Sequence, residues 1–341
     1  MNTDLQNYSH KRYNILTNEW VLVSPHRTKR PWKGKEEKFE TEKRDQYVAD
    51  CYLCSGNIRA NGEKNPDYKD VFVFTNDFAA LEKNQKKKIS VDDGLIQAQS
   101  EVGTCKVICF SHDHSKSLAN MKISKIEKVI EVLQNEFKLL GARKDINYVQ
   151  IFENKGAIMG CSNPHPHGQI WSQASLPNEV AKKDSSQLNY FKKHKKGLLK
   201  TYLDQELQKE ERIIFQNNDF VVLIPFWAVW PYETMIIPKK KSPDISELSS
   251  KERFAFAESI SKLTKMYDAL FNCSFPYSSG IHQAPTNNKK NVHWHWHMVF
   301  YPPLLRSATV KKFMVGYEMF GSPQRDLTPE KAAQNLKKIM I

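Results

Sequence analysis

The chain has 341 residues, 26% of them charged, and 51 Lys and Arg against 38 Asp and Glu give it a formal net charge of +13. It contains no apolar run of the roughly 18–20 residues that a membrane-spanning helix needs, and its first residues, MNTDLQNYSHKRYN, lack the apolar core of a secretion signal. We therefore expect a cytoplasmic protein without a membrane partner, whose six cysteines are thiols rather than disulfides. The positive charge favours anionic partners without choosing between nucleic acid and phosphorylated small molecules.

The first 50 residues or so are polar and are interrupted by Pro25 and Pro31, with one strand-like stretch at 20–23. Proline keeps such a segment extended rather than helical. Trp20 and Trp32 indicate that the segment is docked, because indole rings are seldom left in water. We therefore expect an extended arm that lies on another part of the molecule.

The first half of the chain then alternates between strands and one long helix. In chain order we expect strands at 71–78 and 105–110, a helix over 124–141, a strand at 147–154, and a histidine-rich segment at 163–171. Ser124 is the expected N-cap of the helix and Gly141 its end.

The second half repeats this order. The matching segments are 217–225, 233–238, the helical stretch 249–271, and the histidine-rich stretch 291–303. Four matches in the same order predict a duplicated unit, with halves at 1–181 and 182–341 joined through the basic stretch 182–200. The alternating patterns with one helix in each half predict an α+β fold, in which antiparallel sheets carry helices on one face.

Cys51 and Cys54 form a C-Y-L-C pair. Two thiolates at this spacing can hold a zinc ion from a tight turn, although a C-x-x-C pair also serves in redox chemistry or has no role. Zinc needs two further ligands, for which the sequence offers His112, His114, His165 and His167.

The segment Gly160–Trp171 reads GCSNPHPHGQIW. Alternate residues of an extended strand share a face, so His165, His167 and Gln169 can converge on one spot. Gly168 would let a ligand approach the main chain closely. The alternative is a pair of polar residues on an exposed edge strand.

Such a cluster suits phosphoryl chemistry. A neutral imidazole is a nucleophile near pH 7 because its pKa is about 6.5, and its phosphoramidate passes the phosphoryl group on to another oxygen. If zinc occupies His165, the nucleophile is His167. Gln169 can then donate to a phosphoryl oxygen, and the stretch from Gly160 to Ser162 can add backbone N–H groups and a hydroxyl.

With these motifs the chain resembles the galactose-1-phosphate uridylyltransferases, the transferase branch of the histidine-triad superfamily. The resemblance runs from SPHRTKRPW at 24–32, through CYLCSGN, FENKGAIMGCSNPHPHGQIW and FWAVWPYET, to the C-terminal segment KFMVGYEMFGSPQR. It implies duplicated histidine-triad halves and a ping-pong reaction of galactose metabolism. UDP-glucose gives its uridylyl group to a histidine, glucose 1-phosphate leaves, and galactose 1-phosphate takes the group to form UDP-galactose.

The resemblance also assigns residues. It places the nucleophile at His167 and a phosphate contact at Gln169. The zinc ligands that it implies are Cys51, Cys54, His114 and His165, with His112 unused. The nucleotide contacts that it implies are Asn76, Asp77, Asn154, Gly160, Cys161 and Ser162. The hexose contacts that it implies are Lys312, Phe313, Val315, Tyr317, Glu318 and Gln324. Arg27 and Arg30 match arm residues that reach the neighbouring subunit's nucleotide, which implies a homodimer with shared active sites.

Some relatives hold a second metal in the repeat half with one Glu and three His. The matching residues here are Lys183, His282, His297 and Val299. A lysine repels a metal ion and a valine donates nothing, so we expect one structural zinc per chain and no second metal. His293 and His295 share a strand face with His297 and leave a shifted site open.

Two other functions remain open at this point. A zinc protein that binds nucleic acid is suggested by the C-x-x-C pair, the histidines and the charge, but the sequence lacks the helix and the H-x₃₋₅-H spacing of such modules. A histidine-triad dinucleotide hydrolase or phosphorylase would share the nucleophile, but the segment KFMVGYEMFGSPQR favours a hexose substrate. We expect sugar nucleotides and sugar phosphates as substrates, and no nucleic acid partner.

Overall fold

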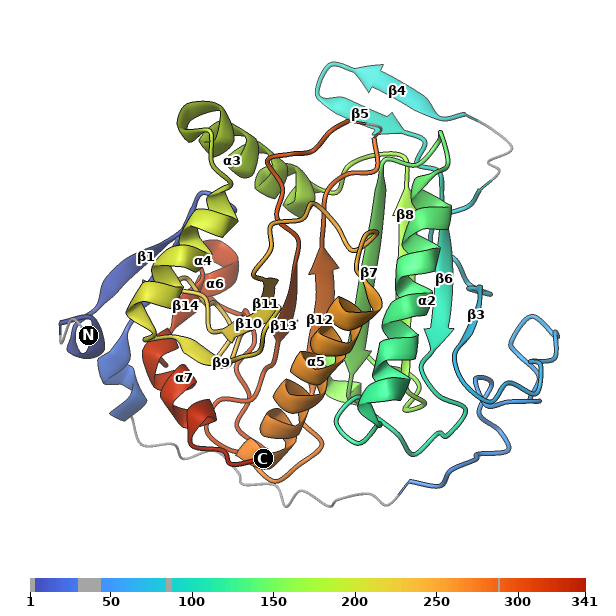
Figure 1. Cartoon of the computed structure of the whole chain (residues 1–341). Coiled ribbons are helices and arrows are strands. Elements are labelled where there is room, and N and C mark those ends of the chain that lie inside the picture. Colours follow the sequence, from blue (N-terminus) through green and yellow to red (C-terminus); the bar gives the residue numbers. More distant parts are fainter. Residues whose placement is uncertain (1–3, 30–43, 84–87, 288) are drawn as a thin grey trace.

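The computed structural model describes residues 4–29, 44–83, 88–287 and 289–341. Its centre is one nine-stranded antiparallel sheet with helices α2 (Ile123–Gly141) and α5 (Ser250–Leu270) side by side on one face (Figure 1). The strand order is β3 (Phe72–Thr75), β6 (Gly103–Cys109), β8 (His167–Gln173), β7 (Tyr148–Lys155), β12 (Tyr277–His282), β13 (His297–Tyr301), β11 (Thr234–Pro238), β10 (Phe220–Leu223) and β9 (Ile213–Gln216).

The predicted duplication is visible in this order. Strands β3, β6, β7 and β8 with α2 form one unit, and β10, β11, β12 and β13 with α5 form the other in the same sequence. The two units meet where β7 pairs antiparallel with β12, Asn154 lying opposite Ser278. The predicted α+β fold of two duplicated units is confirmed, with the two antiparallel sheets joined edge to edge into one.

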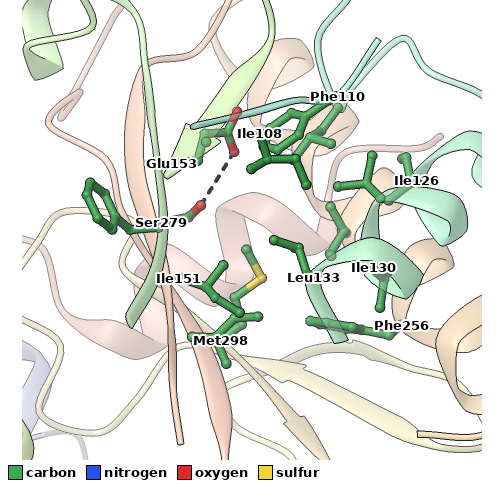
Figure 2. Close-up of a pocket in the computed structure, with 17 residues that line it drawn as sticks. Ile108, Phe110, Ile126, Ile130, Leu133, Ile151, Glu153, Phe256, Ser279 and Met298 are labelled. Atoms are coloured by element: carbon green, nitrogen blue, oxygen red, sulfur yellow. Dashed lines mark hydrogen bonds between the residues drawn. The ribbon is translucent and has the colours of Figure 1, made fainter. Parts of the chain in front are cut away.

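The helix face holds the main core. The apolar positions of α2 that recur at helical spacing are all buried: Ile126, Val129, Ile130, Leu133, Phe137 and Leu140. The first four of them enclose, with α5 and the sheet, an apolar cavity whose polar edge is Glu153 with Ser279 (Figure 2). The expected cap of α2 is wrong, because the helix begins at Ile123 after Lys122 and Ser124 lies in its first turn. Helix α5 instead carries a capping box between Ser249 and Glu252.

The opposite face differs between the two halves. On the second half it is covered by α3 (Asn178–His194), α4 (Leu198–Lys209) and an N-terminal hairpin of β1 (His10–Asn14) and β2 (Glu19–Val23), whose apolar side chains form a second core with the sheet. On the first half the same face carries the segments that hold the candidate site.

The N-terminal arm is built into the second half. Strand β2 pairs with β14 (Gln324–Arg325), and Leu16, Val21 and Val23 are buried. The prediction of an arm docked through its indole is wrong for Trp20, which is 50% exposed. Trp32 lies outside the described residues. The docking comes instead from aliphatic side chains and from a buried ion pair of Arg12 with Glu330 at 2.8 Å.

The remaining elements are short, apart from one terminal helix. They are α1 (Asp4–Asn7), the 3₁₀ turns η1 (Pro25–Lys29) and η2 (Ala157–Met159), α6 (Tyr317–Phe320), α7 (Pro329–Lys337), and the exposed hairpin of β4 (Ser90–Asp93) and β5 (Ile96–Gln99) that projects from the body in Figure 1. Within the described residues, no helix combines the length and the apolar character needed to cross a bilayer.

Candidate active site and metal centre

The face of the first half opposite α2 holds a polar cavity. Ile170 of β8 packs in the core under α2, so the alternating side chains His167, Gln169 and Trp171 point to the other face. The cavity is lined by Phe152, Asn154, Gly160, Cys161, Ser162, His167, Gly168 and Gln169. Seven residues that the sequence singled out, all of these except Phe152, therefore meet in one place, from two neighbouring strands and the loop between them.

The loop before β8 needs glycine at two positions. Gly156 and Gly160 have φ of 89° and 77°, a conformation that other residues rarely adopt. Within this turn the N–H of Gly160 donates to Ala157 O at 3.0 Å and the N–H of Cys161 to Gly156 O at 3.4 Å. These two N–H groups close the turn, so the Ser162 hydroxyl is the loop's side-chain donor at the cavity.

The imidazole of His167 is fixed by its own backbone. Its Nδ1 lies 2.7 Å from the carbonyl oxygen of His165. Because a carbonyl only accepts, Nδ1 carries the proton and Nε2 keeps a lone pair. Burial lowers the pKa of His167, so the ring is neutral and nucleophilic at Nε2.

Gln169 is oriented by the side chain of Trp171, two residues further along β8. The indole N–H of Trp171 donates to Gln169 Oε1 at 2.9 Å. An indole only donates, so this bond fixes the amide oxygen and leaves Nε2 to donate to a ligand. Strand alternation from Gln169 was the signal that could have placed Trp171 on this face.

Gly168 is needed for a different reason from the one predicted. A Cβ there would lie 2.9 Å from Phe110 Cζ and 3.0 Å from Phe152 O. The missing side chain therefore makes room for the Phe110 ring on the helix side, rather than for a ligand on the side of His167.

A candidate metal centre lies just before the same strand. The ligand atoms of Cys51, Cys54, His114 and His165 all lie within 4.8 Å of one another, and all four residues are buried. Cys54 Sγ is 3.6 Å from His114 Nδ1 and 3.5 Å from His165 Nδ1. Two thiolates and two imidazoles at these separations fit a metal such as zinc. His112 is exposed and lies outside the cluster.

Neighbouring groups support these ligands. His165 Nε2 donates to Ser111 O at 2.8 Å, which leaves Nδ1 free for a metal. Asn163 is buried; its amide donates to Cys51 Sγ at 3.4 Å and its Oδ1 accepts from the N–H of His165 at 2.9 Å. Burial raises the pKa of the Cys54 thiol to about 11, so the thiolate needs a bound cation. Asn163 thus joins a metal ligand to the His-Pro-His segment, a role that sequence spacing did not indicate.

Family models for the N-terminal and C-terminal domains of galactose-1-phosphate uridyl transferase match residues 1–177 and 182–340. The chain belongs to the galactose-1-phosphate uridylyltransferase family. It is 51% identical to the Haemophilus influenzae galactose-1-phosphate uridylyltransferase, over 97% of this chain and 95% of that one. It is 44% identical to the Saccharomyces cerevisiae enzyme of the same name, over 98% and 96%.

Two solved structures share the fold. A uridylyltransferase superposes with a TM-score of 0.77 at 24% identity, covering 96% of this chain and 97% of the other. An Arabidopsis thaliana ADP-glucose phosphorylase with bound ADP-glucose gives a TM-score of 0.78 at 23% identity, covering 98% and 100%. At these identities the likeness concerns the fold alone.

The nucleotide residues that the family resemblance placed after β3 do not line the polar cavity. Asn76 Oδ1 accepts from the N–H of Phe78 at 3.0 Å. Asp77 forms an ion pair with Arg59 at 3.3 Å, with both side chains 7% exposed. Arg59 also lies over the ring of Phe74. Arg59 was not predicted, because nothing in its sequence neighbourhood connects it with Asp77.

The predicted hexose residues gather in the C-terminal segment, and none of them lines the cavity around His167. Lys312 pairs with Glu318, and Gln324 Nε2 donates to Asp326 at 2.6 Å. Arg27, which has no acidic neighbour in the sequence, pairs with Asp326 at 3.1 Å. The other exposed or half-exposed members are Phe313, Val315 and Tyr317. Arg30 lies outside the described residues.

Proposed function

We propose that this chain transfers a uridylyl group from UDP-glucose to galactose 1-phosphate, giving UDP-galactose and glucose 1-phosphate in galactose metabolism. Membership of the family supports this activity. The observation that carries it is the state of His167, whose Nδ1–H donates to a carbonyl while its Nε2 stands at a polar cavity. The reaction takes place in the cytoplasm.

The transfer proceeds in two displacements at one phosphorus. His167 Nε2 attacks the α-phosphorus of UDP-glucose, a P–N bond forms, and the P–O bond to glucose 1-phosphate breaks. An oxygen of galactose 1-phosphate then attacks the same phosphorus and releases the imidazole. The uridylyl imidazole carries positive charge, and the carbonyl of His165 stabilises it through Nδ1–H at 2.7 Å. No proton has to leave the ring.

Polar groups around His167 stabilise the charge that develops on the phosphoryl oxygens. Gln169 donates through Nε2, and the Ser162 hydroxyl and the Asn154 amide add donors from the loop and from β7. Cys161 and Gly160 shape the wall. The nucleotide is held by Asn76 and Asp77, and the hexose by the C-terminal residues Lys312, Phe313, Val315, Tyr317, Glu318 and Gln324.

The metal is zinc, one ion per chain, held by Cys51, Cys54, His114 and His165. When bound it would tie the turn of Cys51 and Cys54 and the segment of His114, which are far apart in sequence, to the start of β8. Four protein ligands leave no open position for substrate, so its role is structural.

Mass spectrometry of the protein after incubation with UDP-glucose alone tests the mechanism. We expect one uridylyl adduct, on the peptide that contains His167, and none in His167→Gly, which removes no metal ligand. An adduct on another histidine, or a fully active His167→Gly, would overturn it. Assays with galactose 1-phosphate, with inorganic phosphate and with water as acceptor separate the transferase from a phosphorylase and a hydrolase.

We propose further that the active unit is a homodimer of chains with halves at 1–181 and 182–341, and that Arg27 and Arg30 of one arm reach the other subunit's site. The exposed apolar residues of the C-terminal segment support a partner there: Val315, Tyr317, Met319 and Phe320. Mixing Arg27→Ala/Arg30→Ala chains with His167→Gly chains should restore activity. Failure although mixed dimers form would argue against shared sites.

A further inference from the structure

The repeat half contains a counterpart of the candidate nucleophile. His297 opens β13 as His167 opens β8. Its Nδ1 lies 3.3 Å from the carbonyl oxygen of His295, two residues earlier, as that of His167 does from His165. Both imidazoles lie on the sheet face opposite the long helices.

This counterpart is closed. His297 is fully buried, and its Nε2 has no hydrogen-bond partner in the described part of the chain. Its ring stacks on His282 with centroids 5.3 Å apart. Lys183 of α3, 5% exposed, places Nζ 2.9 Å from His282 Nε2. A lysine from the covering helix therefore occupies the place where the first half has its open cavity.

The cluster does not fit a metal ion. Lys183 offers only donors and a positive charge, and Val299 offers no ligand atom. Among the described residues, the only group of three or more His, Cys, Asp and Glu side chains close enough to share a metal ion is the one made by Cys51, Cys54, His114 and His165. The neighbouring histidines are engaged elsewhere, because His293 Nε2 lies 2.7 Å from Asp184 and His295 Nε2 lies 2.8 Å from Pro238 O.

We propose that the Lys183 ammonium is a built-in cation that takes the place of a second metal ion in the repeat half. This ammonium donates to His282, and because Lys183 belongs to α3 this contact holds the helix against β12 and β13. The histidine pair then keeps its arrangement without any metal supply.

The surroundings support a charged lysine. Burial lowers the pKa of Lys183 to about 8, and Glu179 and Glu233 act in the opposite direction. Glu233 is itself buried, and its carboxylate accepts from the N–H groups of Val229 and Trp230 at 2.6 and 3.1 Å. Burial and the Lys183 charge hold the pKa of His282 well below its usual range, so its Nε2 remains an acceptor.

The proposal makes Lys183→Glu a gain of metal binding. The new carboxylate ends about one bond short of the Nζ position, which leaves room for an ion between it and His282. With His282 and His297 it forms a two-histidine, one-carboxylate set, which suits Fe²⁺. Zinc-loaded protein is dialysed anaerobically against Fe²⁺, passed over a chelating column, and analysed for both elements. We expect one zinc in both proteins, no iron in the wild type, and close to one iron in the variant.

Three further variants make the test decisive. Lys183→Glu/His297→Gln should lose the gained iron, and Lys183→Glu/Val299→His should hold it more tightly, because residue 299 shares a strand face with His297. Lys183→Met has nearly the same length without charge or ligand; it should stay iron-free and melt at a lower temperature, since it removes the donor to His282 and leaves Arg325 as the remaining cation that acts on the buried carboxylate of Glu233.

Two results would overturn the proposal. One is a wild-type chain that takes up one iron under these conditions. The other is a folded Lys183→Glu chain without iron. If that variant does not fold, Lys183→Met decides, because a melting temperature equal to that of the wild type removes the structural role of the ammonium. Metal content and melting are read without any turnover, so the result is independent of the transferase activity.

Discussion

Replacing Glu153 by Gln should make the protein more stable above neutral pH and leave its stability in acid nearly unchanged. Glu153 lies on β7 under the long helices, at the edge of the apolar cavity seen in Figure 2. Its neighbour Ser279 lies at 3.5 Å, the Tyr277 hydroxyl and the Lys155 ammonium also act on it, and the cavity beside it is lined largely by hydrocarbon. Burial raises the pKa of Glu153 to about 7, and Lys155 only partly offsets the effect.

The sign follows from proton binding. An unfolded glutamate deprotonates near 4.5, whereas the folded one holds its proton to about pH 7. Between these values the folded state binds more protons, so the free energy of unfolding falls as pH rises. One pKa unit corresponds to about 1.4 kcal/mol, so the loss is about 3 kcal/mol by pH 8. Glu153→Gln keeps the shape and removes this loss.

Urea unfolding of both proteins at pH 5, 6, 7 and 8 measures the effect. The variant should gain about 2.5 kcal/mol over the wild type between the two ends of the series, since part of the loss has already occurred at pH 5. Glu247→Gln, at an exposed position, is the matched control and should show no such trend. Parallel stability curves for wild type and Glu153→Gln would refute the assignment of a buried, protonated carboxyl.

Three other changes have defined outcomes. Removing the metal with a chelator should lower transferase activity and near-ultraviolet dichroism together, and zinc should restore both; full activity of metal-free protein would contradict a structural role. Trp171→Phe frees the Gln169 amide to rotate, so kcat should fall roughly two- to tenfold with little change in KM, as steady-state kinetics would show. Glu330→Gln leaves the buried guanidinium groups of Arg12 and Arg212 without their shared carboxylate at 2.8 and 2.7 Å. Urea unfolding should show a loss of about 3–5 kcal/mol, and a loss below 1 kcal/mol would show that the network is not needed.

The periodicity of the sequence was enough to predict features that depend on a single helix or strand. The alternation of His165, His167 and Gln169 follows from strand geometry alone, and the structure brings the latter two to one cavity. The buried stripe of α2 likewise follows from helical spacing. The order of elements predicted the duplicated fold because each half repeats one short unit.

Features that depend on contacts across the chain were missed or given the wrong reason. Gly168 makes room for Phe110, about 60 residues away in sequence, and no local pattern reveals such a neighbour. Trp20 is exposed because buried aliphatic residues, not the indole, dock the hairpin. The sequence does not indicate which residue Asn163 contacts, because Cys51 is brought beside it only in the folded chain. The role of a side chain that depends on a residue distant in sequence can therefore be assigned only from the structure.

The two halves show what decides whether a histidine on this fold can react. His167 and His297 have the same place in their strands and the same bond from Nδ1 to a preceding carbonyl, so neither local backbone nor tautomer distinguishes them. The difference lies in what covers the face. In the second half α3, α4 and the N-terminal hairpin bury it, and Lys183 stands at the histidines. In the first half the face keeps a polar cavity with hydrogen-bond donors around Nε2. Whether the histidine of this duplicated motif can react thus depends on which segments cover its face of the sheet. In the second half these segments are α3, α4 and the N-terminal hairpin, which lie outside the repeated unit.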